Sequence, residues 1–107
     1  MIVVTTNEIP NKKVIEVKGV AHGIIVRTPT WTQGFFGGLK KIIGSNNQAY
    51  ANMANQSRED AYQNMIKHAE SLGANAIVAF RYDTSSMDGN GEAISEVFCY
   101  GTAVLVE

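Results

Sequence analysis

The fold of this chain is decided by residues 72–83, which read Leu-Gly-Ala-Asn-Ala-Ile-Val-Ala-Phe-Arg-Tyr-Asp. Gly73 follows the last apolar position of a helical pattern, and glycine is the usual residue for the left-handed conformation that ends a helix. From Ala76 onward, the alternating and β-favouring residues predict a strand over 76–86. The stretch therefore predicts a helix that stops at Gly73 and a strand that starts almost at once.

Upstream of this stretch, apolar residues recur with the 3.6-residue period of an amphipathic helix from about Gln48 to Leu72. Alanine is frequent in this segment, which favours a helix and permits its close approach to a sheet. The members of the stripe are Tyr50, Ala54, Ala61, Tyr62, Met65, Ile66, Ala69 and Leu72. We therefore expect one long helix over 48–72.

Downstream of the strand, residues 88–91 read Asp-Gly-Asn-Gly and predict a tight hairpin turn, because Asn-Gly tolerates positive φ. The return strand is predicted over 93–106. At about 3.3 Å per residue it would span about 43 Å, whereas a compact domain of this size has a radius of gyration of about 13 Å. We expect this strand either to bend, at Gly101, or to reach a neighbouring subunit.

Three further elements precede the long helix. Residues 2–5 and 14–27 are predicted strands, the second with a bulge or bend at a glycine. Apolar residues between Gln33 and Ser45 share one face of a short helix. This order of elements predicts an α+β fold: a two-layer domain with an antiparallel sheet, one long helix and one short helix.

The strand over 76–86 is expected to present two different faces, because side chains alternate along a strand. One face would carry Ala76, Val78, Phe80 and Tyr82, and the other Ile77, Ala79, Arg81 and Asp83. One long helix covers only one face of a sheet, so Ile77 and Ala79 would need cover from a second subunit. The pattern therefore predicts a homo-oligomer, with the chain itself as partner.

Length and charge narrow the class of protein. A chain of 107 residues fits one domain over 1–107. A net charge of −1 gives no electrostatic argument for nucleic acid or an anionic membrane, so neither is expected as a partner. The single cysteine, Cys99, permits no intrachain disulfide, and the N-terminus does not resemble a signal peptide. We therefore expect a cytoplasmic protein.

Several segments together resemble the YbjQ-like family of small bacterial and archaeal proteins, across nearly the whole chain. The matching segments are Thr5-Thr6, Phe35-Phe36-x-Gly38-Leu39 running to Ile42-Ile43-Gly44, Ala49-Tyr50, residues 72–78, and Gly101-Thr102-Ala103-Val104. The resemblance implies a dodecin-like subunit that assembles as a ring, with a pentamer as the expected state. The family is described as heavy-metal-binding, so we ask next which residues could bind a metal.

The residues give little support to a metal or a cofactor. Soft-metal sites commonly use two nearby thiolates, and this chain has one cysteine. Cys99 lies in an alternating strand, where a buried structural thiol is the usual role. A ring could still bring copies of Cys99 or a histidine together at an axis. Cys99 is therefore the candidate ligand of an alternative function, heavy-metal binding at subunit interfaces, and no cofactor is expected.

Catalytic patterns are missing from the sequence, so we expect no enzyme. His22 lies in an apolar strand and His68 near the C-terminal end of the long helix, and structural roles are favoured for both. No phosphate-binding glycine motif, calcium loop or nucleophile motif is present. The only other candidate surface is an aromatic cluster of Trp31, Phe35 and Phe36. We interpret it as a core or subunit interface, with a small-molecule or peptide groove and a membrane-surface helix as the alternatives. An active site between subunits near Trp31 is the third hypothesis.

Overall fold

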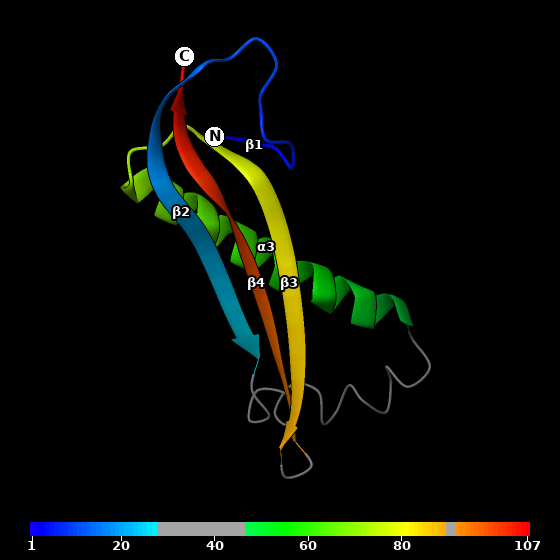
Figure 1. Ribbon diagram of the computed structural model, residues 1–107. Coiled ribbons are helices and arrows are strands. Elements are labelled where there is room, and N and C mark those ends of the chain that lie inside the picture. The colour runs from blue at the N-terminus through cyan, green and yellow to red at the C-terminus, as the bar shows by residue number, and fades with distance from the viewer. Residues whose placement is uncertain (28–46, 90–91) are drawn as a thin grey trace.

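The computed structural model describes residues 1–27, 47–89 and 92–107. Its elements are β1 (Ile2–Val3), β2 (Val14–Arg27), α3 (Asn47–Ser71), β3 (Ala76–Gly89) and β4 (Glu92–Val106). Figure 1 shows α3 running across one face of the three long strands. The predicted α+β fold with a long helix is confirmed. The expected short helix over 33–45 and the tip of the hairpin at 90–91 lie outside the described residues.

The sheet is mixed, not wholly antiparallel as the sequence had suggested. The strand order is β1-β3-β4-β2, with β1 parallel to β3 and the other two pairs antiparallel. A parallel pair needs a long connection between its strands. Here β2 and α3 lie between β1 and β3 in the chain and supply that connection. The short β1 therefore completes the sheet beside β3 at one end only.

α3 ends at the glycine that the sequence indicated. Gly73 has φ of 84°, and its N–H donates to the carbonyl of Glu70. The N–H of Ala74 donates to the carbonyl of Ala69. These two hydrogen bonds form a Schellman motif, which satisfies carbonyl groups that the helix itself leaves unpaired. The chain then enters β3 at Ala76, as predicted.

The core lies between α3 and the sheet face that it covers, called the inner face here. Ala61, Met65 and Ala69, spaced four residues apart on α3, are completely buried. They pack with residues of all three long strands, namely Ala21, Ile77, Cys99 and Ala103. Small side chains on both sides let the helix approach the sheet closely. The helix therefore supplies the cover that Ile77 needs, and the prediction that a second subunit covers Ile77 is wrong.

A β-bulge in β3 changes which side chains share a face. The pairing with β4 shifts between Val78 and Arg81, and Ala79 adopts a φ of 55°. Beyond the bulge, Phe80 packs against the inner core, although Val78 faces the other way. The predicted grouping of Phe80 with Val78 is therefore wrong, because one extra residue reverses the alternation.

The long strands extend the molecule. Its largest dimension is 52 Å and its radius of gyration is 17.1 Å. A compact domain of this length would have a radius of gyration of about 13 Å. β4 therefore fits within one subunit by making that subunit long, with the gentle curvature visible in Figure 1. The predicted irregularity of β2 is confirmed at Gly19, where its pairing with β4 shifts and φ is 129°.

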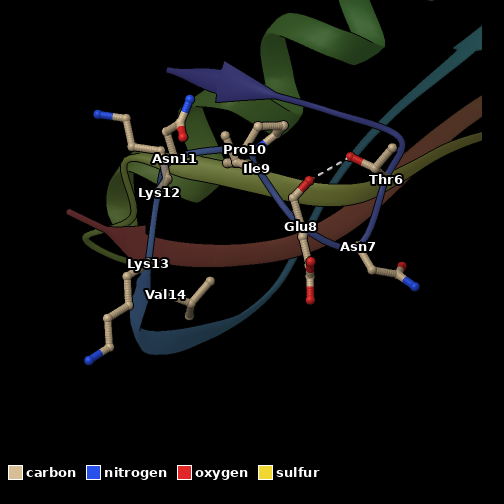
Figure 2. Close-up of a pocket in the computed structure, with 9 residues that line it drawn as sticks. All are labelled: Thr6, Asn7, Glu8, Ile9, Pro10, Asn11, Lys12, Lys13 and Val14. Carbon is tan, nitrogen blue, oxygen red and sulfur yellow. Dashed lines mark hydrogen bonds between the residues drawn. The ribbon is translucent and has the colours of Figure 1, made fainter.

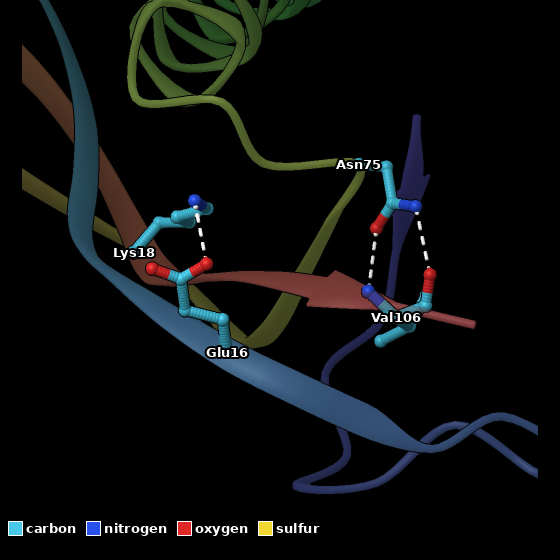
Figure 3. Close-up of polar contacts among 4 residues, drawn as sticks. All are labelled: Glu16, Lys18, Asn75 and Val106. Carbon is cyan, nitrogen blue, oxygen red and sulfur yellow. Dashed lines mark hydrogen bonds and ion pairs between the residues drawn. The ribbon is translucent and has the colours of Figure 1, made fainter.

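One side chain fastens the end of β4. Asn75 accepts a hydrogen bond from the N–H of Val106 at 2.8 Å and donates one to its carbonyl at 2.9 Å (Figure 3). Its amide therefore pairs with β4 as a backbone residue would. Figure 3 also shows the ion pair between Lys18 and Glu16 on β2, 2.8 Å long.

Candidate functional site

The sheet face opposite α3, called the outer face here, is built from side chains that the strand register places in rows. Residues directly opposite each other in neighbouring strands point to the same side. One row joins His22 of β2, Tyr100 of β4 and Arg81 of β3. The next joins Ile24, Phe98 and Asp83. The outer face is therefore apolar and aromatic over β2 and β4, and charged over β3.

The apolar part of this face is exposed. We define the outer patch as Val20, His22, Ile24, Phe98 and Tyr100. Val20 is 62% exposed, Ile24 45% and Tyr100 38%. The rings of Phe98 and Tyr100 stack with centroids 5.5 Å apart, and the His22 ring lies 6.0 Å from that of Phe98. The outer patch is thus an ordered surface of contiguous side chains.

The N-terminal segment covers the other end of the outer face. Val4 and Ile9 pack there against a small cluster of Ala76, Val78, Val104 and Val106. The guanidinium of Arg81 donates to the carbonyl of Thr5 at 3.0 Å, and so ties this segment to β3. The outer patch begins where this cover ends.

Two side chains of α3 reach the edge of the sheet at β2. The N–H of His22 donates to Nδ1 of His68 at 3.1 Å, and Asn64 donates to the carbonyl of Ile24 at 3.5 Å. The rings of His22 and His68 are 4.5 Å apart and inclined at 63°. The two histidines are 46 positions apart, and no pattern in the sequence links them. The usable signal was that Asn64 and His68 are four residues apart on α3, and so lie on one face of the helix.

Cys99, the candidate metal ligand, lies on the inner face and is completely buried. Burial raises the pKa of its thiol above the ordinary value, against the smaller opposing effect of a hydrogen bond with the backbone of Gly23. The thiol is therefore held in its neutral form, whereas a metal ligand is a thiolate.

The aromatic candidates Trp31, Phe35 and Phe36 lie outside the described residues. Within the described part of the chain, three other aromatic side chains gather on the inner face: Tyr62, Phe80 and Tyr82. The hydroxyl of Tyr82 donates to the carbonyl of Arg58 at 3.3 Å. Burial, followed by the nearby Cys99 and Glu59, raises the pKa of Tyr82, so its hydroxyl stays protonated and serves as a donor.

A shallow recess is lined by residues 6–14, between β1 and β2 (Figure 2). Its wall is one continuous segment, shaped in part by a hydrogen bond of 2.7 Å from Thr6 to the carbonyl of Glu8. Ligand sites usually combine polar groups from several elements around an apolar wall. This recess therefore fits the inside of a loop better than a binding pocket.

Two features are absent from the described residues, 1–27, 47–89 and 92–107. No three His, Cys, Asp or Glu side chains within them gather closely enough to hold a metal ion. No helix within them is both long and apolar enough to cross a membrane.

Comparison with known proteins places the whole chain in one sequence group. A YbjQ family described as "Putative heavy-metal-binding" matches residues 1–107. A UPF0145 protein of Francisella tularensis is 56% identical over 106 residues, which cover 99% of both chains. A UPF0145 protein of Legionella pneumophila is 46% identical over 106 residues, covering 99% of this chain and 98% of its own.

A crystal structure from Pediococcus pentosaceus has a similar fold. That protein is described as being of unknown function and as belonging to the DUF74 family. The TM-score is 0.67 at 21% identity, over 100% of this chain and 98% of the other. At this level of identity the likeness supports the fold.

Proposed function

Because this chain belongs to the YbjQ-like family, whose sequence pattern matches it from end to end, we propose that it is a non-catalytic homo-oligomer of binding and assembly character. The subunits meet through the outer patch, and the assembly works in the cytoplasm. A pentameric ring is the form we propose, as the resemblance of the sequence implied.

The observation that carries this proposal is the exposure of the outer patch. Val20 and Ile24 keep 62% and 45% of their surface exposed on the sheet. Full burial of such a side chain is worth roughly 1.5–3 kcal/mol, so covering what remains exposed would yield about 1 kcal/mol for each. Contiguous apolar patches on a protein surface commonly mark interaction sites. A second copy of the chain could cover this patch, and no other protein would then be needed as a partner.

The shape of the subunit also favours a second copy as the occupant. The radius of gyration is 17.1 Å, which is larger than the value of about 13 Å expected for a compact domain of this length. A typical stable interface buries about 800 Å² on each partner, which is more than five side chains provide. The interface must therefore extend beyond the outer patch along the long strands, and these are extended enough to supply it.

The state of the ionisable groups supports the non-catalytic part of the proposal. The pKa values of Cys99 and Tyr82 are both raised by burial. A neutral, buried thiol is a poor nucleophile, and a protonated phenol that donates to a backbone carbonyl is engaged in structure. Neither group is set up for proton transfer or nucleophilic attack.

Light scattering after size exclusion tests the proposal on untagged protein. We expect a mass of several times the 11.6 kDa of one chain, and five times that mass for the pentamer. The double variant Val20→Lys/Ile24→Lys should shift the protein to monomer, since lysine on the outer patch would bury unpaired charge. Asn55→Lys, at an exposed position of α3, is the matched control and should keep the wild-type mass.

Two results would count against the proposal in different ways. A stable wild-type monomer at micromolar concentration would end it. A wild-type oligomer that the double variant leaves intact would keep the assembly but remove the outer patch from its interface.

The heavy-metal description of the family fits the described donors only in part. The one thiol, Cys99, is buried in the subunit core, so copies of it are not in position to meet at an interface. Thiophilic ions such as Cd²⁺ or Hg²⁺ favour thiolates. The described donors that lie close together are two imidazoles, of the exposed His22 and the half-buried His68, which suit a different group of metals.

A further inference from the structure

We propose that His22 and His68 form a two-imidazole site for a borderline divalent ion, Zn²⁺ or Ni²⁺, at the β2 edge of the sheet. These are the two histidines of the chain. The fold brings them together from 46 residues apart, with ring centroids separated by 4.5 Å. Both side chains belong to one subunit, so neither ligand has to come from a second copy, and the site goes beyond the proposed assembly, although His22 is also a member of the outer patch.

The inclination of the rings allows a shared ligand. At 63° the two imidazoles meet edge to face and are not stacked in parallel. A rotation of the exposed His22 ring would turn one of its nitrogens toward an ion held at Nδ1 of His68. The His22 side chain is exposed, and the structure gives its ring contacts with His68 and Phe98 but no hydrogen bond among the described residues. In the single subunit a metal ion can therefore reach the site from solvent, and water can complete its coordination.

Nδ1 of His68 decides how the ion must bind. A neutral imidazole has one nitrogen with a free lone pair, and in His68 that nitrogen accepts the N–H of His22 at 3.1 Å. The other nitrogen then carries the proton and cannot bind a metal. An ion that binds through Nδ1 must therefore displace the backbone N–H of His22. Metal binding at Nδ1 of His68 and the hydrogen bond from the N–H of His22 exclude each other. Loss of this hydrogen bond is therefore the expected signature of metal binding.

The position of His68 also favours a cation. It lies in the last turn of α3, where the negative end of the helix dipole lies. Neutral imidazole is a good ligand for Zn²⁺, Ni²⁺ and Cu²⁺, and a poor match for the thiophilic heavy ions. The structure thus narrows the broad family description to borderline ions at one pair of residues.

Zinc titration of untagged protein tests this site. By calorimetry we expect saturable binding of about one Zn²⁺ per chain, and shifts of the imidazole nitrogens of both histidines by NMR. His22→Ala and His68→Ala should each weaken binding by about tenfold or more, because each removes one of two protein ligands. On adding Zn²⁺, the amide of His22 should exchange its hydrogen faster, since its acceptor is taken by the ion.

Two further variants separate metal binding from the hydrogen bonds that Asn64 and His68 make with the backbone of β2. Asn64→Ala removes the neighbouring contact with β2 but no imidazole, so it should leave zinc affinity unchanged. His68→Gln retains an oxygen acceptor for the N–H of His22 but loses the nitrogen donor, so it should fold normally and lose zinc affinity.

Three results would overturn the proposal. They are the absence of saturable zinc binding, equal affinity in His68→Gln and wild type, and an unchanged exchange rate at His22 in zinc-saturated protein. The first two would leave the pair as a structural contact or an adventitious ion site only. A monomeric wild type that still binds zinc would refute the assembly alone.

Discussion

Gly23 of β2 lies directly against the backbone of α3: a Cβ at this position would be 2.0 Å from the carbonyl oxygen of Ala61. The same Cβ would be 2.5 Å from the backbone nitrogen of Met65. Backbone atoms within a helix cannot move aside as a flexible side chain can. The close approach of α3 to the sheet, and with it the small-residue core, therefore requires glycine at residue 23.

Gly23→Ala should be strongly destabilising. Overpacking a core costs roughly 1–3 kcal/mol and occasionally more, and a clash with backbone belongs at the upper end of that range. Urea unfolding followed by circular dichroism, at one fixed protein concentration, measures the loss. A loss below about 1 kcal/mol would mean that α3 can move away from β2 at little cost.

Gly73→Ala should cost less, for a different reason. A Cβ at residue 73 would meet only the Lys18 side chain, at an ordinary 3.7 Å, so the cost is that of placing alanine at a φ of 84°. That conformation costs an L-residue about 1–2 kcal/mol. Gly73→Asn should cost less than Gly73→Ala, because asparagine tolerates the left-handed region. Equal unfolding midpoints for these two variants would contradict this explanation.

Asn75→Asp should loosen the end of β4. The carboxylate can still accept from the N–H of Val106, but it cannot donate to the carbonyl of Val106 and would repel it. Leaving such a polar group without its partner costs about 1–3 kcal/mol. Hydrogen exchange at Val106, compared with the exposed control Asn55→Asp, measures the effect. Identical protection of Val106 in both variants would show that Asn75 does not fasten the strand.

The local parts of the fold could be predicted from the sequence. A helix stop at Gly73 depends on one residue and its neighbours, and so does the start of a strand at Ala76. The register of β3 could not be predicted. The bulge lies at Ala79, where no glycine in the sequence indicates it. A shift of one residue moves every later side chain of β3 to the opposite face of the sheet.

The candidate sites were missed because they depend on tertiary contacts. The meeting of His22 with His68 follows from how α3 crosses β2, which no local pattern encodes. Cys99 illustrates the reverse case: alternation along its strand predicted a buried structural thiol, and its side chain is completely buried. Strand alternation was enough to predict this burial, because it depends only on which face of its own strand Cys99 occupies.

Alkaline pH should destabilise the protein through Cys99. Burial raises the pKa of its thiol above the ordinary 9.0. In the unfolded chain the thiol ionises at its ordinary pKa, while the folded state keeps the proton. Because the folded state then binds more protons, the free energy of unfolding falls as the pH rises above about 9 and is unaffected below that range. Urea unfolding between about pH 7 and pH 10 measures this slope.

Cys99→Ala is the matched variant for that slope. It should lower stability at neutral pH, because it leaves a small cavity in the core, yet show a flatter decline at alkaline pH. The pKa of Tyr82 is also raised, from an ordinary 10.0, so Tyr82 contributes to the same alkaline loss of stability. Tyr82→Phe removes that contribution and so separates it from that of Cys99. Parallel pH profiles for wild type and Cys99→Ala would show that the thiol is not the group responsible.

Ala79→Gly should stabilise the protein, the opposite of the effect at Gly73. Ala79 holds a φ of 55° while its N–H donates to the carbonyl of Thr6 at 2.8 Å, so the bulge is anchored in a conformation that alanine disfavours. Relieving that conformation is worth about 1–2 kcal/mol, and the greater freedom of glycine in the unfolded chain offsets about 0.5–1 kcal/mol of it. The expected net gain in the free energy of unfolding is therefore about 0.5–1 kcal/mol. Ser85→Gly, at an exposed position of β3 without positive φ, should instead lose a similar amount, and a loss of stability in both variants would show that the bulge at Ala79 is not strained.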